Sequence, residues 1–166
     1  MFKRTAVPPA RTYQRFARQP LNIALGLMEN SPQYVHILPG DNMPDVATKP
    51  SRVLVVLDQL VCRDWQGVVS AWLIKIGCLY MLAWGPGCSG WDDSVDIANS
   101  EAFDHGEIPE ESDAMTTWHD NDTLEEYMWF AKNCAMHSLI ELERTLILHI
   151  GSSSRESEIL QAYAEA

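Results

Sequence analysis

The sequence predicts a doubly wound α/β fold, with a mostly parallel sheet of about four to five strands and helices on both faces. Short β-branched apolar runs recur along the chain, and the clearest covers residues 52–58, which is typical of a strand buried on both faces. Segments whose apolar residues recur at helical spacing separate these runs. Strand and helix alternate four times, which favours right-handed parallel connections.

Each expected strand ends near a polar turn. The strands cover residues 52–58, 78–84, 114–118 and 144–150, and an earlier strand is expected over residues 34–38. Because strand 114–118 is short and weakly patterned, a ferredoxin-like or other α+β arrangement stays open beside the Rossmann-like or flavodoxin-like sheet.

Caps and apolar periodicity mark the first two helices between the strands. Asp64 is expected to cap the first helix, which turns Val68 inward and stops at Gly77. The second helix starts near Trp91 and is expected to bury Ile97.

The later helices complete one domain. A third helix has cap signals in residues 122–126, and the last begins at the capping-box spacing of Ser153 and Glu156. We therefore expect a single α/β domain over residues 51–166. Residues 1–50 are expected to form an N-terminal arm and a Pro-rich linker, with a short helix and one strand.

Charge is distributed unevenly along the chain. The formal net charge is −11, and thirteen Asp or Glu lie between Asp92 and Glu126, where no Lys or Arg occurs. The first 28 residues carry five basic side chains and no acidic one. This predicts an acidic face and a basic arm. The acidic face either aids solubility or docks a protein with a basic surface, whereas nucleic-acid binding is disfavoured.

Cellular location and redox state follow from the apolar runs and the cysteines. The longest apolar stretch, residues 68–84, is interrupted by polar residues and glycines, and no secretory signal is recognisable, so we expect a cytoplasmic protein without a membrane partner. Four cysteines without a C-x-x-C pair indicate reduced thiols. Cys78 and Cys134 are expected in the core, whereas Cys88 lies in a Gly-rich loop.

Ligands of a doubly wound sheet bind beyond the carboxyl ends of its strands. A polar and aromatic crevice is expected there, although ordinary strand-to-helix turns have a similar composition. The residues at these ends are Asp58 and Gln59, residues 84–91, Trp118, His119 and Asp120, and residues 149–154.

Cys88 is the candidate nucleophile of this crevice. Its place at a helix N-terminus would favour the thiolate, with His119 or His149 as base. Asp58 or Asp120 would orient the imidazole. If the protein is a Cys-His hydrolase or transferase, iodoacetamide should alkylate Cys88 before the other thiols. The alternative for His149 is a core residue whose hydrogen bonds are satisfied within the protein.

Three acidic residues follow the Gly-rich loop at residues 85–90. Asp92, Asp93 and Asp96 compensate the dipole of the helix they open, and they would repel a phosphate of the kind that such loops hold in nucleotide binders. Together with Asp58 they offer the carboxylate oxygens that a divalent cation takes as ligands, although we expect no metal and no other cofactor.

Trp118 and His119 form the most unusual local string. A Trp beside acidic and His groups in a loop is typical of an interface anchor, while a packed ring beside a helix cap is the alternative. The expected binding residues are Trp91, Asp92, Asp93, Asp96, Trp118, His119, Asp120 and Ser152.

Three strings give the chain a family resemblance over residues 52–151. They begin at Ala83 (AWGPGC), Trp91 (WDDSVD) and Thr116 (TTWH), the last followed by LEE from Leu124. These strings resemble a family of small uncharacterised bacterial α/β proteins. The resemblance implies a compact α/β domain and supplies no activity.

Three functions remain in view. The leading one is an acidic partner-binding protein, such as an immunity, antitoxin-like or regulatory factor, that docks a basic surface of another macromolecule. The second is a small enzyme or ligand-binding domain using the crevice. The third is a homo-oligomer in which the basic arm of one copy contacts the acidic face of another.

Overall fold

The computed structural model describes residues 31–166. The basic arm over residues 1–20 and the helix expected over residues 21–30 lie outside the described residues. Within residues 31–166, no helix has the length and apolar character needed to cross a membrane.

Five parallel strands form the sheet, in the order β1-β5-β2-β3-β4. This confirms the predicted doubly wound α/β fold and excludes the ferredoxin-like alternative, which needs antiparallel pairs. The strands are β1 (Gln33–Ile37), β2 (Ser51–Leu57), β3 (Cys78–Trp84), β4 (Met115–His119) and β5 (Arg144–Ile150).

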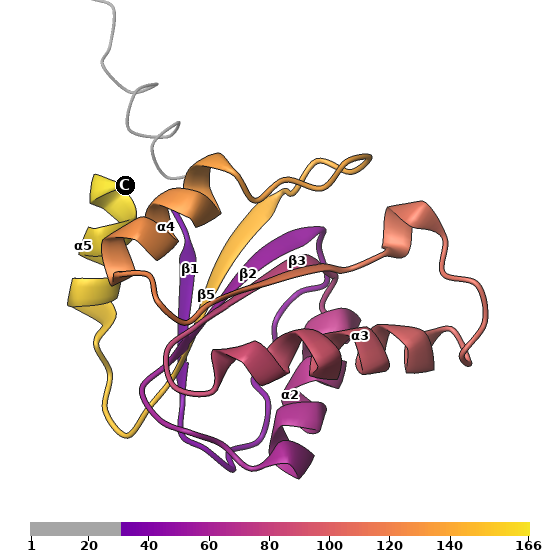
Figure 1. The fold of residues 1–166 in the computed structure, drawn as a ribbon, viewed down its shortest axis with the longest axis horizontal. Coiled ribbons are helices and arrows are strands. Elements are labelled where there is room, and N and C mark those ends of the chain that lie inside the picture. The colour runs from indigo at the N-terminus through magenta and orange to yellow at the C-terminus, as the bar shows by residue number, and fades with distance from the viewer. Residues whose placement is uncertain (1–30) are drawn as a thin grey trace, which may run out of the picture.

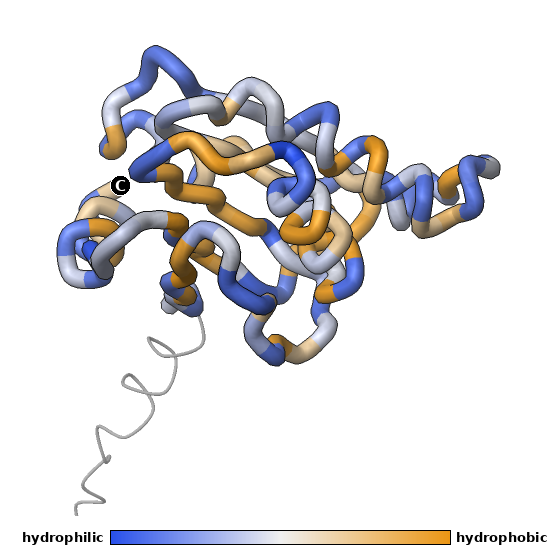
Figure 2. Tube along the Cα trace, turned by 90° about the horizontal axis from the view of Figure 1, so that it is seen from below, coloured by the Kyte–Doolittle hydropathy of each residue, from blue (hydrophilic) through white to orange (hydrophobic). Residues whose placement is uncertain are grey.

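Helices cover both faces of the sheet (Figure 1). One face carries α2 (Arg63–Lys75) and α3 (Trp91–Ala102), and the opposite face carries α4 (Leu124–Asn133) and α5 (Glu156–Glu165). Two short 3-10 turns, η1 (Cys88–Gly90) and η2 (Glu110–Ser112), lie before and after α3. Figure 2 shows apolar positions along the central strands and polar positions along the outer loops.

β1 belongs to the sheet. Its residues pair with β5 from Gln33 opposite Leu146 to Ile37 opposite Ile150. The α/β domain therefore begins before residue 51, where the sequence predicts its start.

Helix caps follow the sequence in one case and depart from it in two. Thr123 and Glu126 form the predicted capping box of α4. Asp64 lies inside the first turn of α2, whose N-cap is Cys62, so it supports the helix dipole and does not cap. The N-cap of α5 is Arg155, with no side-chain cap bond, so the capping box predicted at Ser153 does not form.

Two apolar residues expected inside lie at the surface. Val68 on α2 is 56% exposed and Ile97 on α3 is 58% exposed. Helical spacing alone predicts both side chains to point inward. Each lies beside the buried stripe of its helix, because α2 and α3 pack on the sheet through Val69, Leu73 and Val95.

The chain changes direction between β2 and β5. These strands are neighbours, yet the chain leaves β2 for α2 on one face and leaves β5 for α5 on the other. Ligands of doubly wound sheets bind at such a switch point, beyond the carboxyl ends of the two strands. Residues 58–62 follow β2 there and residues 151–155 follow β5.

Candidate functional site

A chain of hydrogen bonds crosses the switch point. Asp58 Oδ2 lies 2.8 Å from His149 Nε2, and His149 Nδ1 lies 2.7 Å from the hydroxyl of Tyr34. The Tyr34 hydroxyl lies 3.2 Å from Ser154 Oγ. His149 is fully buried, whereas Ser154 is exposed. The chain therefore links an interior imidazole to a hydroxyl at the surface. We call these residues, with Arg155, the Asp58 cluster.

The protonation of the cluster follows from its partners. Burial raises the pKa of Asp58, but the hydrogen bonds and charges of His149 and Arg155 outweigh it and leave this pKa below its ordinary value of 3.8. An ionised carboxylate can only accept, so His149 donates through Nε2–H. The other ring nitrogen, Nδ1, shares a hydrogen bond with the Tyr34 hydroxyl, which can donate or accept.

Arg155 closes the cluster on its α5 side. Its Nη1 contacts Asp58 Oδ1 at 2.5 Å, and the same guanidinium binds Glu158 at the start of α5. The pKa of Arg155 is raised, first by the hydrogen bond to Glu158 and then by Asp58, against the opposing effect of burial. The arrangement can hold a proton relay from Ser154 to Asp58, and it also ties β1, β2, β5 and α5 together.

Cys88 and His119 meet through the backbone and not through the imidazole. Cys88 is 1% exposed, and burial raises the pKa of its thiol, although the His119 amide hydrogen-bonds to it. The His119 ring lies 2.6 Å from Asp122 through Nδ1 and packs edge-on against Phe130 under α4. The predicted Cys-His pair is therefore absent from the described structure. The sequence predicts a loop cysteine whose thiolate is favoured, but burial of Cys88 disfavours the thiolate.

Thiol alkylation is expected to follow exposure. Cys62 and Cys134 are exposed, whereas Cys78 and Cys88 are buried. The sequence predicts Cys134 in the core, but the residue lies at the C-cap of α4. Burial raises the pKa of Cys78 to about 12. With iodoacetamide near neutral pH, followed by peptide mass spectrometry, Cys62 and Cys134 should react first. Early labelling of Cys88 would contradict this structure.

A face of unpaired carboxylates lies on the other side of the molecule, along α3 and β4. Of the ion pairs within residues 31–166, only His119–Asp122 involves an acid between Asp92 and Glu126. β4 is an edge strand, paired only with β3. α3 packs beside β4 on one face of the sheet. We call this surface the acidic edge: Asp92, Asp93, Asp96, Asp113, Trp118 and Asp120.

The carboxylates of the acidic edge repel one another. Burial raises the pKa of Asp96, and the charges of Asp92, Asp113 and Asp93 raise it further. One oxygen of Asp92, Oδ1, is buried without a hydrogen-bond partner in the part of the chain that the structure describes. Both features are unfavourable in the isolated domain. A cationic partner would relieve the repulsion among the exposed carboxylates.

The repulsion gives a testable pH dependence. Because the pKa of Asp96 is raised on folding, its ionised form opposes folding, and this penalty is present above its folded pKa and vanishes as pH falls. Asp96→Asn should therefore stabilise the domain near neutral pH by at most about 0.5 kcal/mol, since the group is exposed to solvent. Urea unfolding at neutral and acidic pH measures it. A variant less stable than the parent at neutral pH would count against the repulsion.

A family match covers most of the chain. The family described as "Domain of unknown function (DUF7684)" matches residues 32–166. The chain belongs to this family. Neither the curated proteins nor the solved structures contain a match. The predicted resemblance to an uncharacterised α/β family is thereby confirmed.

The DUF7684 domain brings together only some of the residues proposed for binding. Asp92, Asp93 and Asp96 on α3 share a face of the sheet with Trp118, which is 47% exposed. Trp91 is 1% exposed and packs in the core beneath α3, so it is not part of that surface. Its helical register turns the indole inward.

Two other proposed residues lie apart from the acidic edge of the DUF7684 domain. The His119 side chain packs under α4 on the opposite face from Trp118, because successive strand residues alternate. Ser152 follows β5, which β2 and β3 separate from β4. Asp120 is exposed directly after β4.

Sequence reasoning names Asp58 and His149 among its candidates but misses Tyr34 and Arg155. Tyr34 lies in a short strand near the N-terminus, and Arg155 lies in a serine-rich turn, so neither carries a motif. A signal is present in His149, a polar residue inside the apolar run of β5. A buried imidazole needs partners, and the register that sets His36 opposite His149 brings Tyr34 into reach.

Proposed function

We propose that this chain is a docking protein that binds a basic surface of another macromolecule through the acidic edge, inside the cytoplasm as the sequence predicts. The observation that carries the proposal is the absence, within residues 31–166, of basic partners for the acids of α3 and of the loop that follows it. Immunity, antitoxin-like and regulatory factors are the kinds of protein that this proposal includes.

Electrostatic cost supports a binding role over a purely solvating one. Charges that only aid solubility are best spaced apart, whereas Asp96 lies among three other carboxylates that raise its pKa. The side chains of Asp93 and Asp96 are exposed, so Lys and Arg side chains of a partner could reach them and remove the repulsion.

The edge strand supplies the remaining features of an interface. One side of β4 has backbone groups that no strand in residues 31–166 pairs with, because β4 ends the sheet. Trp118 on β4 is 47% exposed. A partner segment could add to this edge through backbone hydrogen bonds, with Trp118 as the apolar anchor and the carboxylates as the charged rim.

The experiment is capture of partners by the tagged full chain from its host lysate at low and high salt. A protein with a basic surface should be bound at low salt and released at high salt. Trp118→Ala and Asp96→Lys should each lose it. Matched controls are Trp129→Ala, which removes an equally exposed Trp on α4, and Glu165→Lys on α5. A partner that survives both acidic-edge variants would contradict the proposal.

A second candidate is a small-molecule or enzyme site in the crevice at the switch point. It is favoured by the hydrogen-bonded chain from Asp58 through His149 and Tyr34 to the exposed Ser154. Such a chain can pass a proton to or from a bound molecule. Native mass spectrometry should then find a retained molecule that Tyr34→Phe releases and Asp96→Lys keeps. Equal retention by both variants would exclude the crevice as its site.

A further inference from the structure

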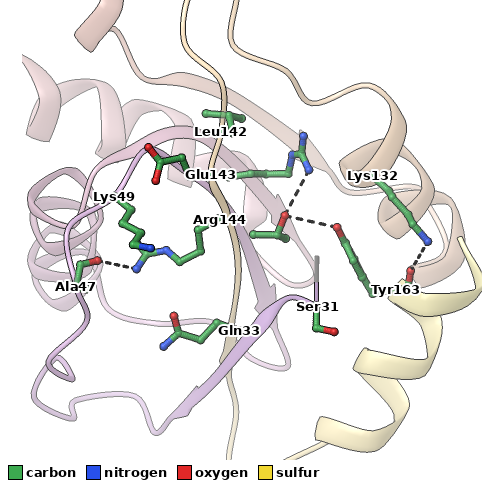
Figure 3. A pocket seen from close by; sticks show the side chains of 11 residues that line it. Ser31, Gln33, Ala47, Lys49, Lys132, Leu142, Glu143, Arg144 and Tyr163 are labelled. Atoms are coloured by element: carbon green, nitrogen blue, oxygen red, sulfur yellow. Dashed lines mark hydrogen bonds between the residues drawn. The ribbon is translucent and has the colours of Figure 1, made fainter. Parts of the chain in front are cut away.

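A cavity with a volume of about 630 Å³ opens at the amino ends of β1, β2 and β5, whereas Asp58 and His149 lie at the carboxyl ends of β2 and β5. Figure 3 shows Lys49 and Arg144 on one side of it, and Lys132 with Tyr163 on the other. Neither the acidic edge nor the crevice uses these residues.

Positive charge is concentrated around this cavity. Residues 31–166 contain seven Lys or Arg, and four of them line it. Glu143 is the single acidic residue in the lining. In a chain with a formal charge of −11, this grouping creates a local field of opposite sign to the whole molecule. The four residues are Lys49, Arg52, Lys132 and Arg144.

Neutral groups hold three of these cations in place. Arg144 donates to Ser51 Oγ at 2.9 Å, to Ala47 O at 2.6 Å and to Ile76 O at 3.1 Å. Arg52 donates through Nε to Ala135 O at 2.8 Å. The geometry of both arginines is therefore fixed before any ligand arrives.

Lys132 is positioned in the same way and also lacks a carboxylate. Its Nζ donates to the carbonyl oxygens of Tyr163 and Ala164 at 3.2 and 3.3 Å. None of the four cations takes part in the ion pairs found within residues 31–166. The cavity thus holds ordered cations that form no ion pair within the described residues.

Helix ends account for only part of this charge. Arg144 contacts the C-cap of α2, Arg52 the residue after the C-cap of α4, and Lys132 the last turn of α5. Each helix C-terminus carries about −0.5 of an elementary charge. Three such ends and Glu143 offset about 2.5 of the four positive charges, which leaves roughly +1.5 in the cavity.

We propose that this cavity binds a small organic anion that carries several negative charges on phosphate or carboxylate groups. Its volume lies within the roughly 300–1,000 Å³ of small-molecule sites. The ordered guanidinium and ammonium groups are the donors that phosphate and carboxylate oxygens accept from. Thr145 and Tyr163 add hydroxyl groups to the lining.

The test is thermal unfolding of the full chain with pyrophosphate, adenosine triphosphate or citrate, each without divalent metal. Sodium chloride at equal ionic strength is the control, because salt alone screens the repulsion of a highly charged chain. A bound anion should raise Tm in proportion to the logarithm of its concentration above Kd, by roughly 5–10 °C at a hundredfold excess over Kd. Comparing the phosphates with citrate shows which anionic group the cavity prefers.

Charge reversal locates the effect. Lys49 has an exposed side chain, and Lys49→Glu should weaken binding about tenfold. Lys75→Glu, an exposed lysine outside the cavity lining, and Tyr34→Phe, whose hydroxyl contacts His149 and Ser154 and does not line the cavity, should keep the full shift. A shift that sodium chloride reproduces, one that Lys49→Glu leaves unchanged, or the lack of any shift would overturn the proposal.

Discussion

Replacing Gly85 with Ala is expected to lower the free energy of unfolding by about 3–5 kcal/mol. Gly85 has φ of +104°, a conformation that L side chains rarely adopt. A Cβ at this position would lie 2.1 Å from the backbone oxygen of Leu57. The clash is with backbone of a buried strand, so β2 or the turn after β3 must move. Urea unfolding followed by far-UV circular dichroism measures the loss.

A second glycine provides the control for this prediction. Gly67 lies in the middle of α2 with nothing within 4 Å of the position that an alanine Cβ would take, and its φ is not in the positive range. Gly67→Ala should therefore stabilise the domain by about 0.5–1 kcal/mol through helix propensity. Equal stability of the two variants would show that β2 and the turn at Gly85 are not in such close contact.

Asp58→Ala is expected to cost about 2–4 kcal/mol near neutral pH. The substitution leaves the buried His149 without its acceptor and removes one carboxylate from Arg155. Because the pKa of Asp58 is lowered on folding, the stabilisation is full above its ordinary value of 3.8 and is lost as pH falls through the folded pKa. Urea unfolding of parent and variant from neutral to acidic pH should show the difference narrowing.

Glu158→Gln separates the buried part of this network from the exposed part. Glu158 contacts Arg155 at the surface and is itself exposed. Its substitution should cost less than about 1 kcal/mol, as measured exposed pairs do. If the Glu158 variant were as unstable as the Asp58 variant, the stabilisation would come from the surface pair and not from His149.

The sequence is informative about the fold because burial in a parallel sheet leaves a strong local pattern. The runs at residues 52–58, 78–84 and 144–150 need only apolar side chains on both faces. β4 is the weakest prediction because an edge strand alternates in burial and is short. The predictions that Val68 and Ile97 point inward are wrong, because the spacing of apolar residues locates the apolar face of a helix but not the width of the part that is buried.

The candidate site is less predictable because it depends on contacts between distant segments. His149 and Tyr34 are 115 residues apart in the chain, and only the register of β1 on β5 brings them together. The burial of Cys88 depends on how η1 packs against Trp91 and the sheet, which composition does not encode. The acidic edge is accessible to sequence reasoning because it rests on a long run of residues of one charge.

The most direct test of the docking function is site-specific photocrosslinking in host lysate at low and high salt. A photoreactive amino acid is placed at position 97 on α3, beside Asp96, or, as the matched control, at position 129 on α4, since both side chains are exposed. Docking at the acidic edge predicts a crosslink from position 97 to a protein with a basic surface, which does not form at high salt and is absent from position 129. No crosslink from position 97, or the same product from both positions, would contradict the docking function.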